Sequence, residues 1–175
     1  MIEVVDCSIL DVDSKYIAHQ ANCVTSVAAH LAEKLFSKFP YADIYSSRKS
    51  TNHIDTPGTI IVKGDGVENR FVINMLGQYY PGKSKFPNSN LDGVAARKRY
   101  FFSCLTCISK IEDLNSIAFP YMIGCGAAGG DWEWYNSMLE KFAKHVEDRA
   151  KVLLCRFESP EAKISVSHHA LKIPG

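Results

Sequence analysis

The chain has 175 residues, of which 46% are hydrophobic and 22% charged, with 20 basic and 19 acidic side chains. This length suits one domain with a single core, and the hydrophobic content excludes an intrinsically disordered chain. The formal net charge of +1 does not favour nucleic acid as a partner, because a protein that neutralises phosphates usually carries a basic excess.

The first residues alternate charged and apolar side chains, unlike a signal peptide, and no apolar run has the length of a membrane span. We therefore expect an intracellular protein, cytoplasmic or nuclear, with no membrane partner. Most of the six cysteines lie in apolar segments, as small hydrophobic side chains do in a reducing compartment. Cys104 and Cys107 have the spacing of a zinc-ligand pair, but no second pair follows, so core packing is favoured and neither metal nor cofactor is expected.

Short apolar and β-branched runs alternate with segments of helical periodicity along the chain. Runs typical of strands cover residues 1–5, 16–22, 59–63, 71–76, 116–122 and 151–157. Helical spacing covers residues 27–39, with Ser26 as the expected N-cap, and then residues 91–111 and 131–146. Residues 46–58 and 77–90 read as polar or turn-rich loops.

This alternation predicts an α/β domain: a three-layer α/β/α sandwich around a mixed, mainly parallel central sheet. The expected domain covers residues 1–158, and residues 159–175 form a peripheral C-terminal tail. In such sheets ligands bind beyond the carboxyl ends of the strands, where strand meets helix. Two junctions of that kind stand out, at residues 22–30 and 124–131.

The second junction consists mostly of small residues after a buried strand. Small residues let a backbone approach a ligand, and the free N–H groups of a loop and a helix start favour an anion. Asp131 is expected to cap the following helix. The residues of the loop are Gly124, Cys125, Gly126, Ala127, Ala128, Gly129 and Gly130. On these residues alone, a phosphate-binding loop and a tight packing turn remain equally open.

The letters IGCGAAGGDW, preceded by FPY, resemble the second ligand loop of macrodomains. The resemblance is to the subgroup of ADP-ribose 1''-phosphate phosphatases and related ADP-ribosyl hydrolases. Three further segments are similar to that subgroup: IAHQANCVT, HLAEKLFSKFPYADIY and VINMLGQYYPG. Together they cover most of residues 1–157 in the expected order, so the resemblance implies a macrodomain-like fold.

The resemblance also implies a role for each matching residue. Asn22 corresponds to an asparagine that contacts the distal ribose, and His19 to a histidine proposed as catalytic. Ile9 falls where a backbone group meets the adenine, and Ser8 stands at the position of an adenine-binding aspartate. The loop around the diphosphate and distal ribose corresponds to Gly124, Cys125, Gly126, Ala127, Ala128 and Gly129, followed by Asp131. From the residues alone, His19 is equally a structural strand histidine, and Asn22 is also read as a turn residue bonded to its own backbone.

The first ligand loop departs from the family pattern. Residues 26–32 read SVAAHLA, so His30 replaces a glycine that normally lets the backbone approach the ligand. Its side chain either blocks the distal ribose site or supplies a cation or proton donor beside a phosphate. Ser8 in place of the aspartate weakens the expected selectivity for adenine.

The function implied is hydrolysis of an ADP-ribose derivative, above all removal of the terminal phosphate of ADP-ribose 1''-phosphate, or release of ADP-ribose from a conjugate. The candidate catalytic residues are His19, Asn22 and His30. The alternatives are a non-catalytic module that binds ADP-ribose or a nucleotide, and a degenerate domain with an altered ligand or with protein or RNA contacts. We expect a monomer whose partner is an ADP-ribose derivative.

Overall fold

The computed structural model describes residues 1–157, so the expected tail at 159–175 lies outside the described residues. The strands are β1 (Ile2–Val5), β2 (Tyr16–Asn22), β3 (Ile60–Lys63), β4 (Phe71–Gln78), β5 (Asn115–Pro120) and β6 (Ala150–Cys155). The helices are α1 (His30–Lys38), α2 (Arg48–Thr51), α3 (Val94–Ser109) and α4 (Trp132–Val146), with a 3-10 turn at Pro40–Ala42. No helix in this part of the chain is long and apolar enough to cross a membrane.

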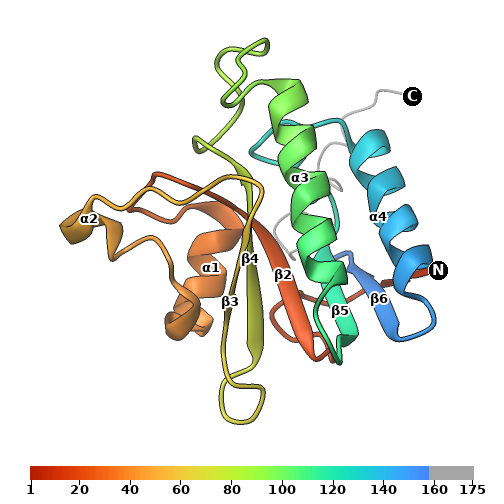
Figure 1. The fold of residues 1–175 in the computed structure, drawn as a ribbon. Helices are drawn as coiled ribbons and strands as arrows, with labels where there is room; N and C mark the ends of the chain where they lie inside the picture. The colour runs from red at the N-terminus through yellow and green to blue at the C-terminus, as the bar shows by residue number, and fades with distance from the viewer. Residues whose placement is uncertain (158–175) are drawn as a thin grey trace, which may run out of the picture.

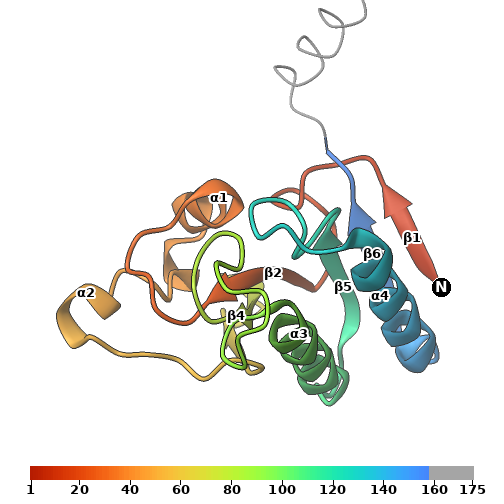
Figure 2. The ribbon, with the colours of Figure 1, turned by 90° about the horizontal axis from the view of Figure 1, so that it is seen from above.

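The strands form one six-stranded sheet in the order β1-β6-β5-β2-β4-β3. All neighbouring pairs are parallel except β3 and β4, which are antiparallel, so the expected mixed and mainly parallel sheet is confirmed. Helix α1 covers one face, and α3 and α4 lie side by side on the other (Figure 1). Seen from above, the sheet separates α1 from α3 and α4, which confirms the three-layer sandwich (Figure 2).

Each face of the sheet has its own hydrophobic core, because successive side chains of a strand point to opposite faces. In β2, Ala18 packs with Phe101 of α3, whereas its neighbour Ile17 packs with Leu35 of α1. Cys104 is fully buried in the core beneath α3, so its predicted role in core packing is confirmed. The two cores hold the carboxyl ends of β2, β4 and β5 at one edge of the sheet.

The start of α1 differs from the prediction. The helix begins at His30 rather than at Val27, its N-cap is Ala29, and no side chain caps it. Ser26 therefore does not cap α1, because residues 25–29 form an extended loop that leads into the helix. This loop brings the uncapped helix start to the edge where β2 and β5 end.

Candidate functional site

A cleft of about 550 Å³ lies beyond the carboxyl ends of β2, β4 and β5, where ligands bind in sheets of this kind. One wall is the loop after β2 together with the start of α1, and the facing wall is the segment after β5. The residues that line it are Gln20, Ala21, Asn22, Thr25, Val27, Ala29–Ala32, Tyr45, Gln78, Pro81, Gly82 and Pro120–Ala128. The two junctions singled out by the sequence therefore meet across one cavity.

The wall after β5 is a tight loop whose backbone faces the cleft. Gly124 adopts φ +77°, and a Cβ there would lie 2.6 Å from Cε1 of Tyr135, so this position requires glycine. Gly126 has no heavy atom within 4 Å of the Cβ position, so a ligand can approach its backbone. Among residues 1–157, the N–H groups of Gly126, Ala127 and Ala128 have no hydrogen-bond acceptor. Three unpaired donors in succession can bind an anion together, as nests of backbone N–H groups do.

The end of this loop is closed by its own hydrogen bonds. The N–H of Gly130 donates to the Gly124 carbonyl at 3.0 Å, and the Asp131 carboxylate accepts from the Glu133 N–H at 3.2 Å. Asp131 is therefore the predicted helix cap, but neither it nor Gly129 lines the cleft, so their expected ligand contacts are not supported. Cys125 does line the cleft, and burial raises the pKa of its thiol to about 12, which keeps the thiol protonated.

Asn22, at the end of β2, hydrogen-bonds to the backbone of the turn that follows it, which is one of the two interpretations of this residue from the sequence. Its Oδ1 accepts from the N–H groups of Val24 at 3.1 Å and Thr25 at 2.9 Å. Its Nδ2 donates to the Tyr45 hydroxyl at 3.2 Å, which leaves one amide hydrogen for a ligand. Asn22 thus shapes the first wall and lines the cleft, without a group that can transfer a proton.

Tyr45 is a cleft residue that sequence reasoning missed. Its hydroxyl oxygen also accepts from the Asn22 backbone N–H at 2.9 Å, so its own hydrogen remains available as a donor. Burial raises the pKa of this phenol to about 12, which keeps it protonated. Nothing in the local sequence marks Tyr45 as a cleft residue, because its position depends on tertiary contacts with Phe36, Arg48 and Asn22.

His30 adopts a backbone conformation that favours glycine. It has φ +55°, a left-handed conformation that a non-glycine residue adopts at a cost of about 1–2 kcal/mol. The N–H groups of His30, Leu31 and Ala32 have no acceptor outside the helix among residues 1–157. The first wall therefore also presents unpaired donors at a helix N-terminus, a position that favours anions.

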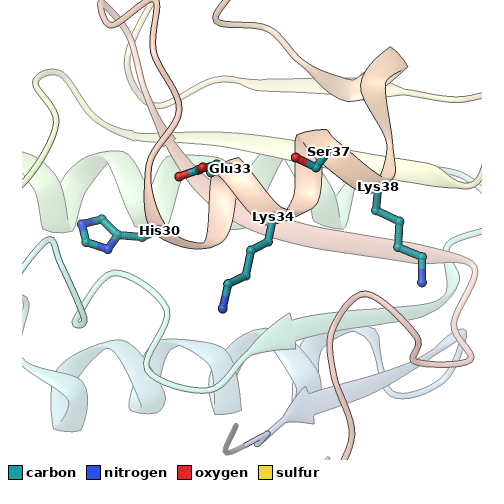
Figure 3. Close-up of a pocket in the computed structure, with 5 residues that line it drawn as sticks. All are labelled: His30, Glu33, Lys34, Ser37 and Lys38. Atoms are coloured by element: carbon teal, nitrogen blue, oxygen red, sulfur yellow. The ribbon is translucent and has the colours of Figure 1, made fainter. Parts of the chain in front are cut away.

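The His30 imidazole extends beyond the end of α1, while Lys34 and Lys38 follow along the same side of the helix (Figure 3). His30 borders both the cleft and the groove beside α1. It does not fill the cleft, since the cavity remains open beside it. The two interpretations of His30, as a block to the distal ribose or as a proton donor or cation beside a phosphate, both stay predictions.

Two arginines are buried beneath the walls of the cleft. Arg48 is 3% exposed and pairs with Asp55 at 2.5 Å, while donating to the carbonyls of Asn22 and Thr25, both at 3.0 Å. Arg97 is 4% exposed and pairs with Asp92 at 2.7 Å. Sequence reasoning missed both because charged residues are rarely buried, and only the tertiary partners make burial tolerable.

His19 does not reach the cleft, so its assignment as a catalytic residue is not supported. It is 1% exposed, packs edge-on against Phe36, and its Nε2 lies 2.6 Å from Oδ1 of Asn74. Asn74 donates its Nδ2 to two carbonyls, so its Oδ1 accepts and Nε2 of His19 carries the proton. Desolvation lowers the pKa of His19 to about 4, which keeps it neutral. The structural reading of His19 is the one observed.

The adenine-site candidates also lie outside the cleft lining. The Ser8 hydroxyl accepts from the Leu10 N–H at 3.1 Å, and its carbonyl accepts from Asp11 and Val12. Ile9 is 5% exposed and belongs to the core beneath α1. Both residues stabilise the turn after β1, and their contact with a ligand stays a prediction.

Comparison with known proteins identifies the fold. No protein-family model and no curated protein matches the sequence. The macrodomain of Mycobacterium tuberculosis DarG is similar, with 20% identity, TM-score 0.69, and coverage of 89% of this chain and 98% of that one. The Thermus aquaticus DarG macrodomain has 19% identity, TM-score 0.63, and coverage of 89% and 98%. The Oceanobacillus iheyensis macrodomain solved with ADP has 15% identity, TM-score 0.62, and coverage of 98% and 93%. This chain therefore has the macrodomain fold.

Proposed function

We propose that this chain binds ADP-ribose derivatives in the cleft between the loop after β2 and the loop after β5. The observation that carries the proposal is the pair of facing walls that each present unpaired backbone N–H groups. One run covers Gly126–Ala128 and the other covers His30–Ala32, and both runs line the same cavity. A diphosphate offers acceptor oxygens to both walls at once, and helix starts and nests are built for such anions.

The charge of the lining supports an anionic ligand. No aspartate or glutamate is among the described residues that line the cleft, and His30 is its one basic side chain. The volume of about 550 Å³ suits a ligand of nucleotide size. Macrodomains of Oceanobacillus iheyensis and Trypanosoma brucei, both similar in fold, were solved with ADP. These features support ADP-ribose derivatives over a neutral metabolite.

We expect the purified chain to bind ADP-ribose in a calorimetric titration, and Gly126→Leu to weaken that binding at least tenfold. A Cβ at Gly126 would have no heavy atom within 4 Å, so we expect the variant to fold while its leucine side chain adds four carbon atoms beside the backbone that a ligand approaches. Its melting temperature, expected within about 2 °C of the parent's, is the control for folding. An absence of binding by the parent would contradict the proposal, as would undiminished binding by Gly126→Leu.

A second candidate function is hydrolysis of the terminal phosphate of ADP-ribose 1''-phosphate, and the position of His30 favours it. His30 is the one histidine that lines the cleft among residues 1–157, since His19 is buried elsewhere, and an imidazole can act as a general base. In this reaction a water attacks phosphorus while His30 takes its proton, and the bond from phosphorus to the ribose oxygen breaks. Inorganic phosphate leaves, and the ribose oxygen takes up the proton that His30 received, which gives ADP-ribose with a 1''-hydroxyl and returns His30 to its neutral form. The N–H groups facing the cleft would stabilise the negative charge.

Phosphate release from ADP-ribose 1''-phosphate tests this activity. Removing a general base is expected to slow turnover by about 10²- to 10⁴-fold in His30→Ala. The matched control is His145→Ala, which removes an exposed histidine of α4 remote from the cleft and should retain the parent's rate. Binding without turnover by the parent identifies a binding module, and equal turnover by the parent and His30→Ala excludes His30 as the base.

A further inference from the structure

A single buried guanidinium joins the second wall of the cleft to the long loop that follows β4. Arg97, near the start of α3, meets both carboxylate oxygens of Asp92: Nε lies 3.0 Å from Oδ1 and Nη2 lies 2.7 Å from Oδ2. Asp92 in turn accepts from the Tyr79 N–H at 2.8 Å. Both side chains are at least nine-tenths buried. The pair therefore holds the two ends of the loop between β4 and α3 together.

The remaining donors of Arg97 reach three backbone carbonyls. Nη1 donates to Gly82 at 2.7 Å and to Ala128 at 3.3 Å, and Nη2 donates to Tyr80 at 3.2 Å. Only Ala128 belongs to the loop after β5. Five donors in a rigid plane allow one arginine to span these groups, which a lysine ammonium cannot do in the same geometry.

The contact at Ala128 completes a turn. The peptide between Ala128 and Gly129 donates its N–H to the Gly126 carbonyl at 3.1 Å and accepts from Arg97 through its own carbonyl. It is thus held at both ends, which fixes the orientation of the turn from Gly126 to Gly129. The N–H groups of Gly126, Ala127 and Ala128 face the cleft as a consequence of this orientation.

The same network continues into the floor of the cleft. Gln78 donates to the carbonyls of Tyr80 at 2.9 Å and Gly82 at 3.4 Å, and Gln20 donates to Oε1 of Gln78 at 2.6 Å. Gln20, Gln78 and Gly82 line the cleft, as Ala128 does. Arg97 and Gln78 therefore share the carbonyls of Tyr80 and Gly82 as acceptors. These shared contacts join the floor of the cleft, the loop after β4 and the loop after β5.

We propose that Arg97 is a positioning residue for ligand binding: it holds the Gly126–Gly129 turn against Pro81–Gly82, so that the loop after β4 forms a third wall of the site. The effect of Arg97 on ligand binding rests on the proposed function. Its effect on the position of the turn does not. An arginine that served α3 alone would have no reason to contact Ala128.

The test compares two variants with a matched control. Arg97→Met combined with Asp92→Asn removes both buried charges and keeps an acceptor for the Tyr79 N–H, so the fold is retained. Arg97→Lys keeps the charge pair but cannot span the three carbonyls. The control is Arg70→Met, because Arg70 also donates to backbone carbonyls, those of Val12 and Ser14, at the opposite end of β2 and β4.

The first readout is amide hydrogen exchange of the ligand-free protein. Exchange of the Gly129 N–H, which donates to the Gly126 carbonyl, should accelerate about tenfold in both Arg97 variants, relative to the rest of the chain, and not in Arg70→Met. Uniform acceleration over the whole chain would show that Arg97 only stabilises the fold and would overturn the proposal. Parent-like exchange of the Gly129 N–H in Arg97→Lys would also overturn it, since the charge pair would then suffice.

The second readout is the affinity for ADP-ribose, which should fall about tenfold in the Arg97 variants and stay within twofold in Arg70→Met. Unchanged affinity in the Arg97 variants would overturn the proposal for binding. If the parent itself does not bind ADP-ribose, the proposed function fails, and the exchange measurement still decides whether Arg97 positions the turn.

Discussion

Replacing Arg48 with methionine is expected to lower the free energy of unfolding by about 3–5 kcal/mol, because it leaves the Asp55 carboxylate without its buried partner. Arg48 is 3% exposed, and its guanidinium also holds the carbonyls of Asn22 and Thr25 and stacks on the Tyr45 ring at 4.8 Å. The variant loses all of these contacts together. Urea unfolding followed by circular dichroism measures the loss.

The matched control is Lys49→Met, because Lys49 is the exposed neighbour of Arg48 on the same short helix. It should change the free energy of unfolding by about 0.5 kcal/mol or less. The double variant Arg48→Met with Asp55→Leu should recover much of the stability, since no unpaired buried charge remains. Equal losses in Arg48→Met and Lys49→Met would refute the buried ion pair.

The free energy of unfolding should also decrease as the pH falls, because His19 is buried in its neutral form. Desolvation lowers its pKa to about 4 in the folded chain, against 6.5 in the unfolded chain. Folding therefore favours the neutral imidazole, and this contribution is complete above pH 6.5 and is lost as the pH falls toward 4. The pKa difference corresponds to about 3 kcal/mol in all, of which about 2 kcal/mol is lost between pH 7 and pH 5.

The variant His19→Gln tests this dependence, because glutamine can donate to Asn74 but does not titrate in that range. The loss of unfolding free energy between pH 7 and pH 5 should be about 2 kcal/mol smaller in this variant than in the parent. His145→Gln, which replaces an exposed histidine, should retain the parent's pH dependence. The idea fails if the parent and His19→Gln lose stability equally on acidification.

The regular elements and one wall of the cleft were predictable because their signals are local. A short apolar run places β2 at residues 16–22, as predicted, and the apolar stripe of α4 and its Asp131 cap follow from adjacent residues. The small residues from Gly124 to Ala128 indicated, for the same reason, a loop whose backbone a ligand can approach, and these residues line the cleft. Local spacing and residue size are sufficient for such features.

The geometry of the other wall, formed by the loop after β2 and the start of α1, depends on tertiary contacts. His30 looked like the loss of a required glycine, yet it adopts φ +55° because the surrounding loop imposes that conformation. Arg48, remote from the cleft in sequence, anchors the carbonyls of Asn22 and Thr25 from below. The sequence at residues 26–32 contains neither the constraint on His30 nor the partner of Arg48.

The identity of the acid–base candidate also depended on the fold. His19 and His30 were both candidates by residue type, but alternation along β2 turns His19 into the core against Phe36, whereas the end of α1 leaves His30 at the cleft. By itself, then, the sequence determined the layers, the two junctions and the glycine-rich loop, because these depend on neighbouring residues. Only the tertiary structure decided which side chains reach the cleft and which buried charges hold its walls, because those depend on contacts between residues far apart in the chain.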